Sequence, residues 1–340
     1  MATSERVLVG QPFSLPKAGD SGSALLAVLW VSAALAAIAL SLSTTVLGET
    51  DRASTALDGL RSYYLASGGI QRATYEMFWS TRQQPEKRLI PQGANHVDYT
   101  FPAGNVHVEI LSETGKLNVN SATPEELYRL CAALGMDAER AREIALAIVD
   151  WRTFVPPEQG GALDQYYLSL TPSFRPRHAS LEEIEELLLV KGITPDIFYG
   201  TYVPSEDTSG PRLLPRQGLI DCLSVFGARG VVDANSAPPA VLAAVGLPPD
   251  AIAAIVERRR IAPFTQQQLS EFQQAYSIPG IRIGVAGNST ITLRATARIR
   301  LQNGQLSEMR RTVGAQIKYM QDGSDAPVHI LRWYDTAGGN

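Results

Sequence analysis

The chain has 340 residues, of which 45% are hydrophobic and 19% are charged, and its formal net charge is −4. This composition excludes a disordered chain, and the length predicts a second domain or an appendage. Because acidic and basic residues nearly balance, the chain has no overall attraction for nucleic acid or acidic lipid.

An uncharged stretch lies near the N-terminus, between Ser21 and Gly48. A membrane-spanning helix needs about 20 predominantly apolar residues, and residues 23–47 are long enough. The apolar core of a secretory signal is shorter, about 7–15 residues. A soluble core helix is rarely apolar on every face over such a length. We therefore expect a single transmembrane helix over residues 23–47.

Residues 1–22 form a polar segment that ends in Gly22. This segment resembles class III prepilin leaders, which a prepilin peptidase cleaves after a glycine. The resemblance predicts cleavage between Gly22 and Ser23, with the apolar helix retained on a methylated mature N-terminus.

The first residues after this bond are the expected anchor and assembly residues, Leu25, Leu26, Ala27 and Leu29. Pilins usually carry Glu at the fifth mature position, where this chain has Ala27. Burying that carboxylate in an apolar bundle requires a partner charge from the next subunit. The absence of this Glu suits a subunit above which no other subunit is recruited. The alternative is that the residue changed by sequence drift in an ordinary membrane anchor.

The helical pattern continues beyond the anchor as an amphipathic arm. Its apolar residues lie roughly on one stripe, and they are Ala53, Leu57, Leu60, Tyr64, Ile70, Ala73 and Met77. We expect Gly68 and Gly69 to interrupt this helix.

Strand-like runs occur at residues 96–101 and 105–111, and again after residue 288. The Asn-Gly in residues 301–305 predicts a hairpin between two of the later strands. Helical patterns fill the sequence between the two groups. We therefore expect an α+β fold, in which a small antiparallel sheet is interrupted by a large all-helical insertion. The expected domains are a leader at 1–22, the helix at 23–47, an arm with sheet at 48–113 and 284–340, and the insertion at 114–283.

The insertion contains an internal repeat. Asn120-Ser121-Ala122 aligns with Asn235-Ser236-Ala237, and each triplet is followed by proline, a short helix, a turn and a second helix that ends in arginine. Gly135 and Gly246 suit left-handed turns between the helices. We expect Ser121 or Thr123 to cap the first helix of the first repeat. These features predict two helix-hairpin-helix-like units.

The charges of these units favour a protein scaffold over nucleic-acid binding. Residues 113–152 contain 5 basic and 7 acidic residues, and residues 230–272 contain 3 and 4. Phosphate binding normally needs several cations. We interpret Arg258–Arg260 as a solvated helix end. Between the repeats, residues 178–191 read as one helix that stops at Gly192.

No catalytic motif is present: the chain has no GxSxG, HExxH or P-loop. Residues 150–152 (Asp-Trp-Arg) are expected to provide packing and a surface pair. Cys131 and Cys222 form either a disulfide or two separately buried thiols. The histidines have no metal-ligand spacing to one another, and they are His96, His107, His178 and His329.

The order of these features resembles a known family, the K-type minor pseudopilins of type II secretion systems (general secretion pathway protein K). The matching segments follow the family's order, and they are residues 116–130, 148–152, 181–198, 232–247 and 255–260. The resemblance implies a non-enzymatic tip subunit of a periplasmic pseudopilus, which serves protein export across the outer membrane. It implies a single-pass protein of the bacterial inner membrane with most of the chain in the periplasm.

The resemblance also implies partners and one ion. The implied partners are minor pseudopilins of the I and J types, the prepilin peptidase, and the secretin or exported proteins, with no nucleic acid. Some family members bind calcium, and the candidate ligands here are carboxylates such as Glu158, Asp164, Asp221 and Asp233. The alternative function is a membrane-anchored helix-hairpin-helix DNA-binding protein of a DNA-uptake system.

Overall fold

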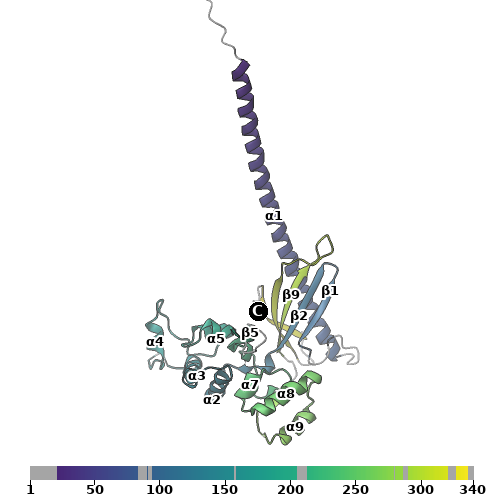
Figure 1. Cartoon of the computed structure of the whole chain (residues 1–340). Helices are drawn as coiled ribbons and strands as arrows, with labels where there is room; N and C mark the ends of the chain where they lie inside the picture. The colour runs from purple at the N-terminus through teal and green to yellow at the C-terminus, as the bar shows by residue number, and fades with distance from the viewer. Residues whose placement is uncertain are drawn as a thin grey trace, which may run out of the picture. The chain divides into compact units, whose positions relative to one another are not determined.

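The computed structural model describes residues 21–82, 90, 94–156, 158–204, 213–278, 280–285, 290–320 and 327–335 (Figure 1). The chain divides into two units, residues 1–60 and 61–340. Residues 1–20, which include most of the expected leader, lie outside the described part.

The long helix α1 runs without a break over Ser21–Arg82. The expected interruption at Gly68 and Gly69 is therefore wrong. A Cβ atom on Gly69 would lie 2.6 Å from Cγ1 of Val106, whereas one on Gly68 would meet nothing within 4 Å. Gly69 thus permits a close approach of the helix to a strand, which is the usual reason for a glycine inside a regular element.

The apolar residues of α1 beyond the anchor lie on more than one face, so the expected single stripe is also wrong. An α-helix turns by about 100° per residue, so residues six positions apart, such as Tyr64 and Ile70, point about 120° away from each other. Ala66, Ile70 and Ala73 are buried, while Tyr64 and Tyr75 are exposed. The buried residues belong to a core that α1 shares with the sheet.

The main sheet has five strands in the order β1-β2-β9-β10-β11, and every pair is antiparallel. The bounds are β1 His96–Phe101, β2 Gly104–Ser112, β9 Thr290–Ile299, β10 Arg311–Tyr319 and β11 Val328–Tyr334. Alternate residues of β2 and β9 are buried against α1, as expected for a sheet covered on one face. The first two strands and the last three come from opposite ends of the second unit.

The chain between β2 and β9 is mainly helical and has its own core. Its helices are η2 Glu113–Gly115, α2 Pro124–Ala133, α3 Ala138–Arg152, α4 Asp164–Leu168, η3 Ile184–Leu189, α5 Pro195–Tyr199, α6 Leu219–Cys222, α7 Pro239–Ala244, α8 Pro249–Ile261 and α9 Gln266–Ala275. Helices and an antiparallel sheet are thus combined in one chain, which confirms the expected α+β class.

The expectation that the insertion is all-helical is wrong, because it also contains three short strand pairs. The pairs β3 (Leu117–Asn118) with β6 (Leu223–Ser224) and β7 (Val232–Asp233) with β8 (Ile283–Gly284) are parallel. The pair β4 (Thr201–Pro204) with β5 (Leu213–Arg216) is antiparallel. Strands of two to four residues are too short to show an alternating pattern.

The segment between the two repeats differs from its prediction. The expected helix before Gly192 is the short 3-10 helix η3, and α5 follows it as a separate helix. Gly192 has φ of 86°, and its Cβ position lies 3.2 Å from Ile144 of α3. The chain therefore turns where it packs on α3, and a longer regular helix would not follow that path.

Candidate functional site

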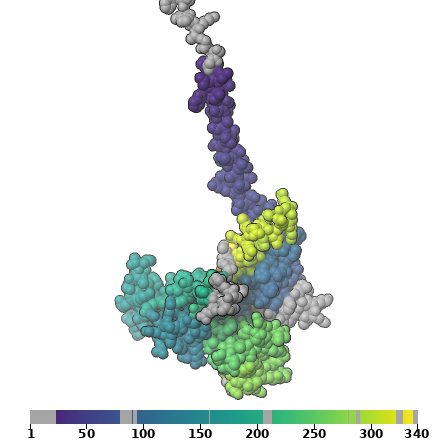
Figure 2. Space-filling model, in the orientation of Figure 1, coloured from purple at the N-terminus to yellow at the C-terminus, as the bar shows by residue number. Residues whose placement is uncertain are grey.

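The first candidate surface is the apolar part of α1. Leu25, Leu26 and Leu29 are between 59% and 70% exposed, and no part of the apolar window is buried within the chain. Figure 2 shows this purple helix bare on its visible face. By length and composition it is the one helix of the described residues that could cross a membrane. An uncovered apolar surface of this size requires lipid or other helices around it.

The predicted processing site adjoins this surface. Gly22 and Ser23 lie in the first turn of α1, directly before the anchor residues. Ala27 is part of the same exposed helix and contributes only a methyl group.

The second candidate surface is an exposed stripe on the part of α1 that belongs to the second unit. Tyr64 is 65% exposed and Tyr75 is 58% exposed, and the open Gly68 lies between them. Tyr64, Gly68 and Tyr75 lie on the same side of the helix because three turns take about 11 residues. This side faces away from Ile70, which packs on the sheet.

The first repeat contains a tied loop, which is the loop at residues 119–122 held in place by side-chain hydrogen bonds. The Asn120 side chain donates to the Leu181 carbonyl at 2.9 Å and accepts from the Leu181 amide at 2.8 Å. Arg152, at the end of α3, donates to the carbonyls of Val119 and Ala122. Burial lowers the pKa of the Arg152 guanidinium from its ordinary value.

Helix α2 begins with a capping box between Thr123 and Glu126. The Thr123 hydroxyl accepts from the Glu126 amide at 3.1 Å, and the Glu126 carboxylate accepts from the Thr123 amide at 2.8 Å. These bonds satisfy two amides that the first turn of a helix leaves without partners. The predicted cap is therefore confirmed.

The second repeat reproduces the tied loop of the first. The Asn235 side chain donates to the Phe264 carbonyl at 3.1 Å and accepts from its amide at 2.7 Å. Arg259 of α8 donates to the carbonyls of Ala234 at 3.1 Å and Ala237 at 2.7 Å. Burial also lowers the pKa of Arg259. The middle arginine of residues 258–260 is therefore a partly buried clamp, and its interpretation as solvated is wrong.

Each pair of helices is joined through a glycine with a left-handed backbone, as predicted. Gly135 has φ of 80° and Gly246 has φ of 98°. Arg216 lies against Gly135 and donates to the Leu134 carbonyl, so this turn is occupied by another part of the chain. Arg129 lies beside Gly246. The turn at Gly135 is therefore occupied by Arg216 and is not an open phosphate site.

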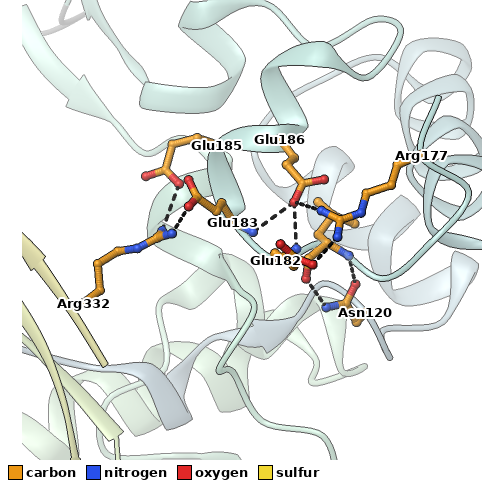
Figure 3. A network of polar contacts seen from close by, with 8 residues as sticks. Asn120, Arg177, Glu182, Glu183, Glu185, Glu186 and Arg332 are labelled. Carbon is orange, nitrogen blue, oxygen red and sulfur yellow. Dashed lines mark hydrogen bonds and ion pairs between the residues drawn. The ribbon is translucent and has the colours of Figure 1, made fainter. Parts of the chain in front are cut away.

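An ionic network joins the sheet to the insertion (Figure 3). Arg332 of β11 donates to Glu183, and its Nη1 lies 3.8 Å from Glu185 Oε2. On the other side of the same loop, Arg177 pairs with Glu182 and donates to Glu186 at 3.1 Å. The network lies at the start of η3 and holds it beside the last strand.

The residues of the Asp-Trp-Arg triplet have separate roles. Trp151 is buried, and its ring packs edge-on against Tyr167 and Phe174. Asp150 Oδ1 accepts from the Ala162 amide at 3.1 Å. The expected packing role is confirmed for Trp151, whereas the expected surface pair is wrong because Arg152 bonds to backbone carbonyls.

Both cysteines are buried free thiols in the structure. Cys131 lies in α2 and Cys222 ends α6. Burial raises the pKa of each thiol to about 12, and the nearby Cys131 also contributes to the shift of Cys222. Deprotonation is therefore strongly disfavoured at either sulfur, which makes both unreactive. A disulfide between them under oxidising conditions stays the alternative prediction.

The four candidate calcium ligands do not converge. Asp164 Oδ1 lies 2.7 Å from His178 Nε2, Asp221 accepts from the Gly218 amide, and Asp233 accepts from the Ser236 hydroxyl. Glu158 is exposed. No three His, Cys, Asp or Glu residues of the described part form a group suited to a metal ion. These carboxylates therefore do not fit one shared calcium site.

The combination of helix, sheet and insertion is similar to that of known proteins. The sequence model of the family "Type II secretion system (T2SS), protein K" matches residues 106–200, from β2 to α5. Within residues 106–200 the chain is similar to the protein K family. The resemblance inferred from the sequence is therefore confirmed.

One curated protein and one solved structure extend the comparison beyond residues 106–200. The type II secretion system protein K of Pseudomonas aeruginosa is 25% identical over 192 residues, which are 51% of this chain and 58% of that protein. The chain thus matches somewhat over half the length of that relative. The crystal structure of the GspK-GspI-GspJ complex from enterotoxigenic Escherichia coli contains a chain of similar fold, with a TM-score of 0.57 and 16% identity, covering 85% of this chain and all of that one.

Sequence reasoning missed the two arginine clamps and the network of Figure 3. The two arginine clamps could have been predicted from the sequence, because each repeat has an asparagine in its loop and an arginine at the end of its second helix. No sequence pattern indicates the contact of Arg332 with Glu183, because the two residues are far apart in the sequence and lie in different expected domains.

Proposed function

We propose that this protein is a minor pseudopilin that forms the tip of a type II secretion pseudopilus and has no enzymatic role. The single observation that carries this proposal is the similarity of residues 106–200 to protein K, in a chain whose helix α1 is apolar and uncovered near the N-terminus. In this proposal α1 lies in the bacterial inner membrane in a single pass, and residues beyond the anchor are periplasmic. The subunit acts by packing against other subunits in protein export.

The position at the tip is supported by bulk and by the anchor. The insertion at residues 114–283 has its own core beside the sheet, and such a mass would not fit inside a filament of closely packed stems. Ala27 provides no carboxylate for a subunit above it.

The neighbours in the complex are proposed to be minor pseudopilins of the I and J types. The exposed stripe of Tyr64, Gly68 and Tyr75 provides a surface on which the stem of such a neighbour can pack. The secretin or the exported proteins are proposed contacts of the insertion.

The two repeats are proposed to be helix-hairpin-helix-like units that serve as protein scaffold. Their loops are tied by Arg152 and Arg259, and the turn at Gly135 is covered by Arg216. Their net charge is negative. These observations favour a packing role over the alternative of DNA binding.

Prepilin peptidase is proposed to cleave the Gly22–Ser23 bond. The decisive experiment is the N-terminal sequence of the protein purified from its native membrane. A start at Ser23 is expected, and a Gly22→Ala variant should accumulate as the uncut form. A mature protein that starts at Met1 or Ala2 would overturn prepilin processing.

Assembly can be tested on the exposed stripe with a matched pair of variants. Neither Gly59 nor Gly68 has a neighbour within 4 Å of its Cβ position, and both lie in α1. They are nine positions apart, which is about two and a half helical turns, so their Cβ positions project from opposite sides of the helix. Gly68→Leu should reduce co-purification with the I- and J-type partners, whereas Gly59→Leu should retain it. Equal co-purification of both variants would contradict the proposed stem contact.

A further inference from the structure

The hairpin of β1 and β2 places four polar side chains on one face. In its register His96 lies opposite Glu109, and Asp98 lies opposite His107. Residues two apart on a strand share a face, so these four side chains project from the same side of the hairpin. The intervening Val97 and Val108 pack into the core on the other side, where Val97 is partly buried and Val108 is fully buried.

The two histidines occupy the diagonal of this group and face one another. Their ring centroids lie 5.3 Å apart, and the ring planes differ by 32°. Eleven positions separate them in the sequence, so spacing alone did not show the pair. The strand register brings them together.

Both imidazole rings are oriented through the same nitrogen. Nδ1 of His107 lies 2.7 Å from Asp98 Oδ1, and Nδ1 of His96 lies 2.8 Å from Asn95 Oδ1. A carboxylate or amide oxygen only accepts, so Nδ1 is the donor in each ring. In a neutral imidazole this leaves Nε2 with its lone pair. The described residues offer no hydrogen bond to either Nε2 atom.

We propose that His96 and His107 together bind a divalent transition-metal ion, of the class of Zn²⁺ or Cu²⁺, through their Nε2 atoms. Metal-ligating histidines characteristically donate their other ring N–H to a carboxylate or another oxygen, as both rings do here. Since a Zn–N bond is about 2.0–2.1 Å, the two Nε2 atoms must come within about 4 Å of each other. Both side chains are exposed, so small rotations about their side-chain bonds can bring the atoms together.

The rest of the coordination follows from the surroundings. The described residues hold no ready group of three ligands, so the ion is held by two imidazoles and water. Glu109 lies across from His96 on the same face, and its carboxylate is 3.5 Å from the guanidinium of Arg294. Imidazole favours Zn²⁺, Cu²⁺ and Ni²⁺, whereas calcium requires six to eight oxygen ligands. The site is therefore distinct in chemistry from any calcium site.

The bound ion would link an edge strand to its neighbour. Strand β1 is the outer strand of the sheet and pairs only with β2 among the described strands. A metal bridge between His96 and His107 adds a second connection between these two strands. Because the ion binds the folded hairpin better than the unfolded chain, it should raise the unfolding temperature.

The test is a metal titration of the full-length protein in detergent. Equilibrium dialysis with Zn²⁺ should give one ion per chain, and the electron paramagnetic resonance spectrum with Cu²⁺ should show coupling to two nitrogens. His96→Gln and His107→Gln should each weaken binding at least about tenfold, and Asp98→Asn should weaken it about tenfold through loss of ring orientation. His329→Gln is the matched control, because His329 is an exposed histidine of β11.

Each other result overturns the proposal. It fails if the wild-type protein binds no Zn²⁺ or Cu²⁺, if His96→Gln or His107→Gln binds as well as the wild type, or if excess Ca²⁺ displaces the ion. Loss of binding in His329→Gln would place the site elsewhere. Circular dichroism of each variant checks that the sheet is intact, and His96 and His107 are exposed enough for substitution without loss of folding.

Discussion

The two adjacent glycines of α1 should respond to alanine in opposite ways. Glycine in a helix interior is less stable than alanine by about 0.8–1.0 kcal/mol. At Gly68 the added methyl group enters open space, so Gly68→Ala should stabilise the protein by up to about 1 kcal/mol. At Gly69 the same methyl would lie 2.6 Å from Val106 Cγ1 and 3.4 Å from Val108 Cγ2.

Val106 cannot easily move away from that methyl. Its side chain is 1% exposed, lies in the core of the sheet and is stiff because it is β-branched. Overpacking of a core costs about 1–3 kcal/mol. After the helix-propensity gain, Gly69→Ala should destabilise the protein by up to about 2 kcal/mol, which leaves the two variants separated by about 1–3 kcal/mol.

Chemical denaturation of the full-length protein in detergent measures this difference, with far-ultraviolet circular dichroism to follow the sheet and helix together. A fluorescence probe on β2 would report the same transition locally. If Gly69→Ala were as stable as Gly68→Ala, the close approach of α1 to Val106 would be refuted.

Three further outcomes are expected. Arg152→Met removes two charge-assisted bonds to carbonyls of the first repeat, each worth about 1.5–3 kcal/mol. It should lower the free energy of unfolding by at least about 3 kcal/mol in denaturant melts, and an unchanged value would show that these bonds are dispensable. Cys131 and Cys222 should resist alkylation in the folded protein, because both thiols are buried. After denaturation they should be alkylated without any reductant, as free thiols are. If alkylation of the denatured protein required a reductant, the two cysteines would be paired in a disulfide. Arg332→Gln should weaken the contact with Glu183, so the backbone amides of η3 should exchange their hydrogens faster than in the wild type. The exchange rate should also depend less on salt, because the variant lacks the ionic contact. Exchange rates equal to those of the wild type would contradict the network.

The main sheet and the repeats could be predicted because their signals are local. Val106, Val108 and Ile110 alternate with polar residues, and this period of two identifies β2 directly. The repeated Asn-Ser-Ala triplets identify the paired units in the same way. The class of fold and the order of its parts follow from such patterns.

The errors came from features that depend on partners distant in the sequence. Gly69 reads as a helix breaker until Val106 is placed beside it. Arg259 reads as a solvated charge until the carbonyl of Ala237 is in reach. His96 and His107 read as isolated until the strand register pairs them with each other's neighbours. In each case, tertiary contact decided the role of a residue whose local sequence was neutral.

The division of the sheet has a consequence for the order in which the chain folds. Strand β2 pairs with β9, so Ser112 meets Ile291 only after the whole insertion has been traversed. Bringing the ends of a long flexible segment together costs entropy, and a segment that is already compact reduces that cost. The insertion has a core of its own, which allows it to fold before the sheet closes. Until then the edge of β2 is unpaired and open to aggregation, so survival of the newly made chain depends on how quickly the insertion becomes compact.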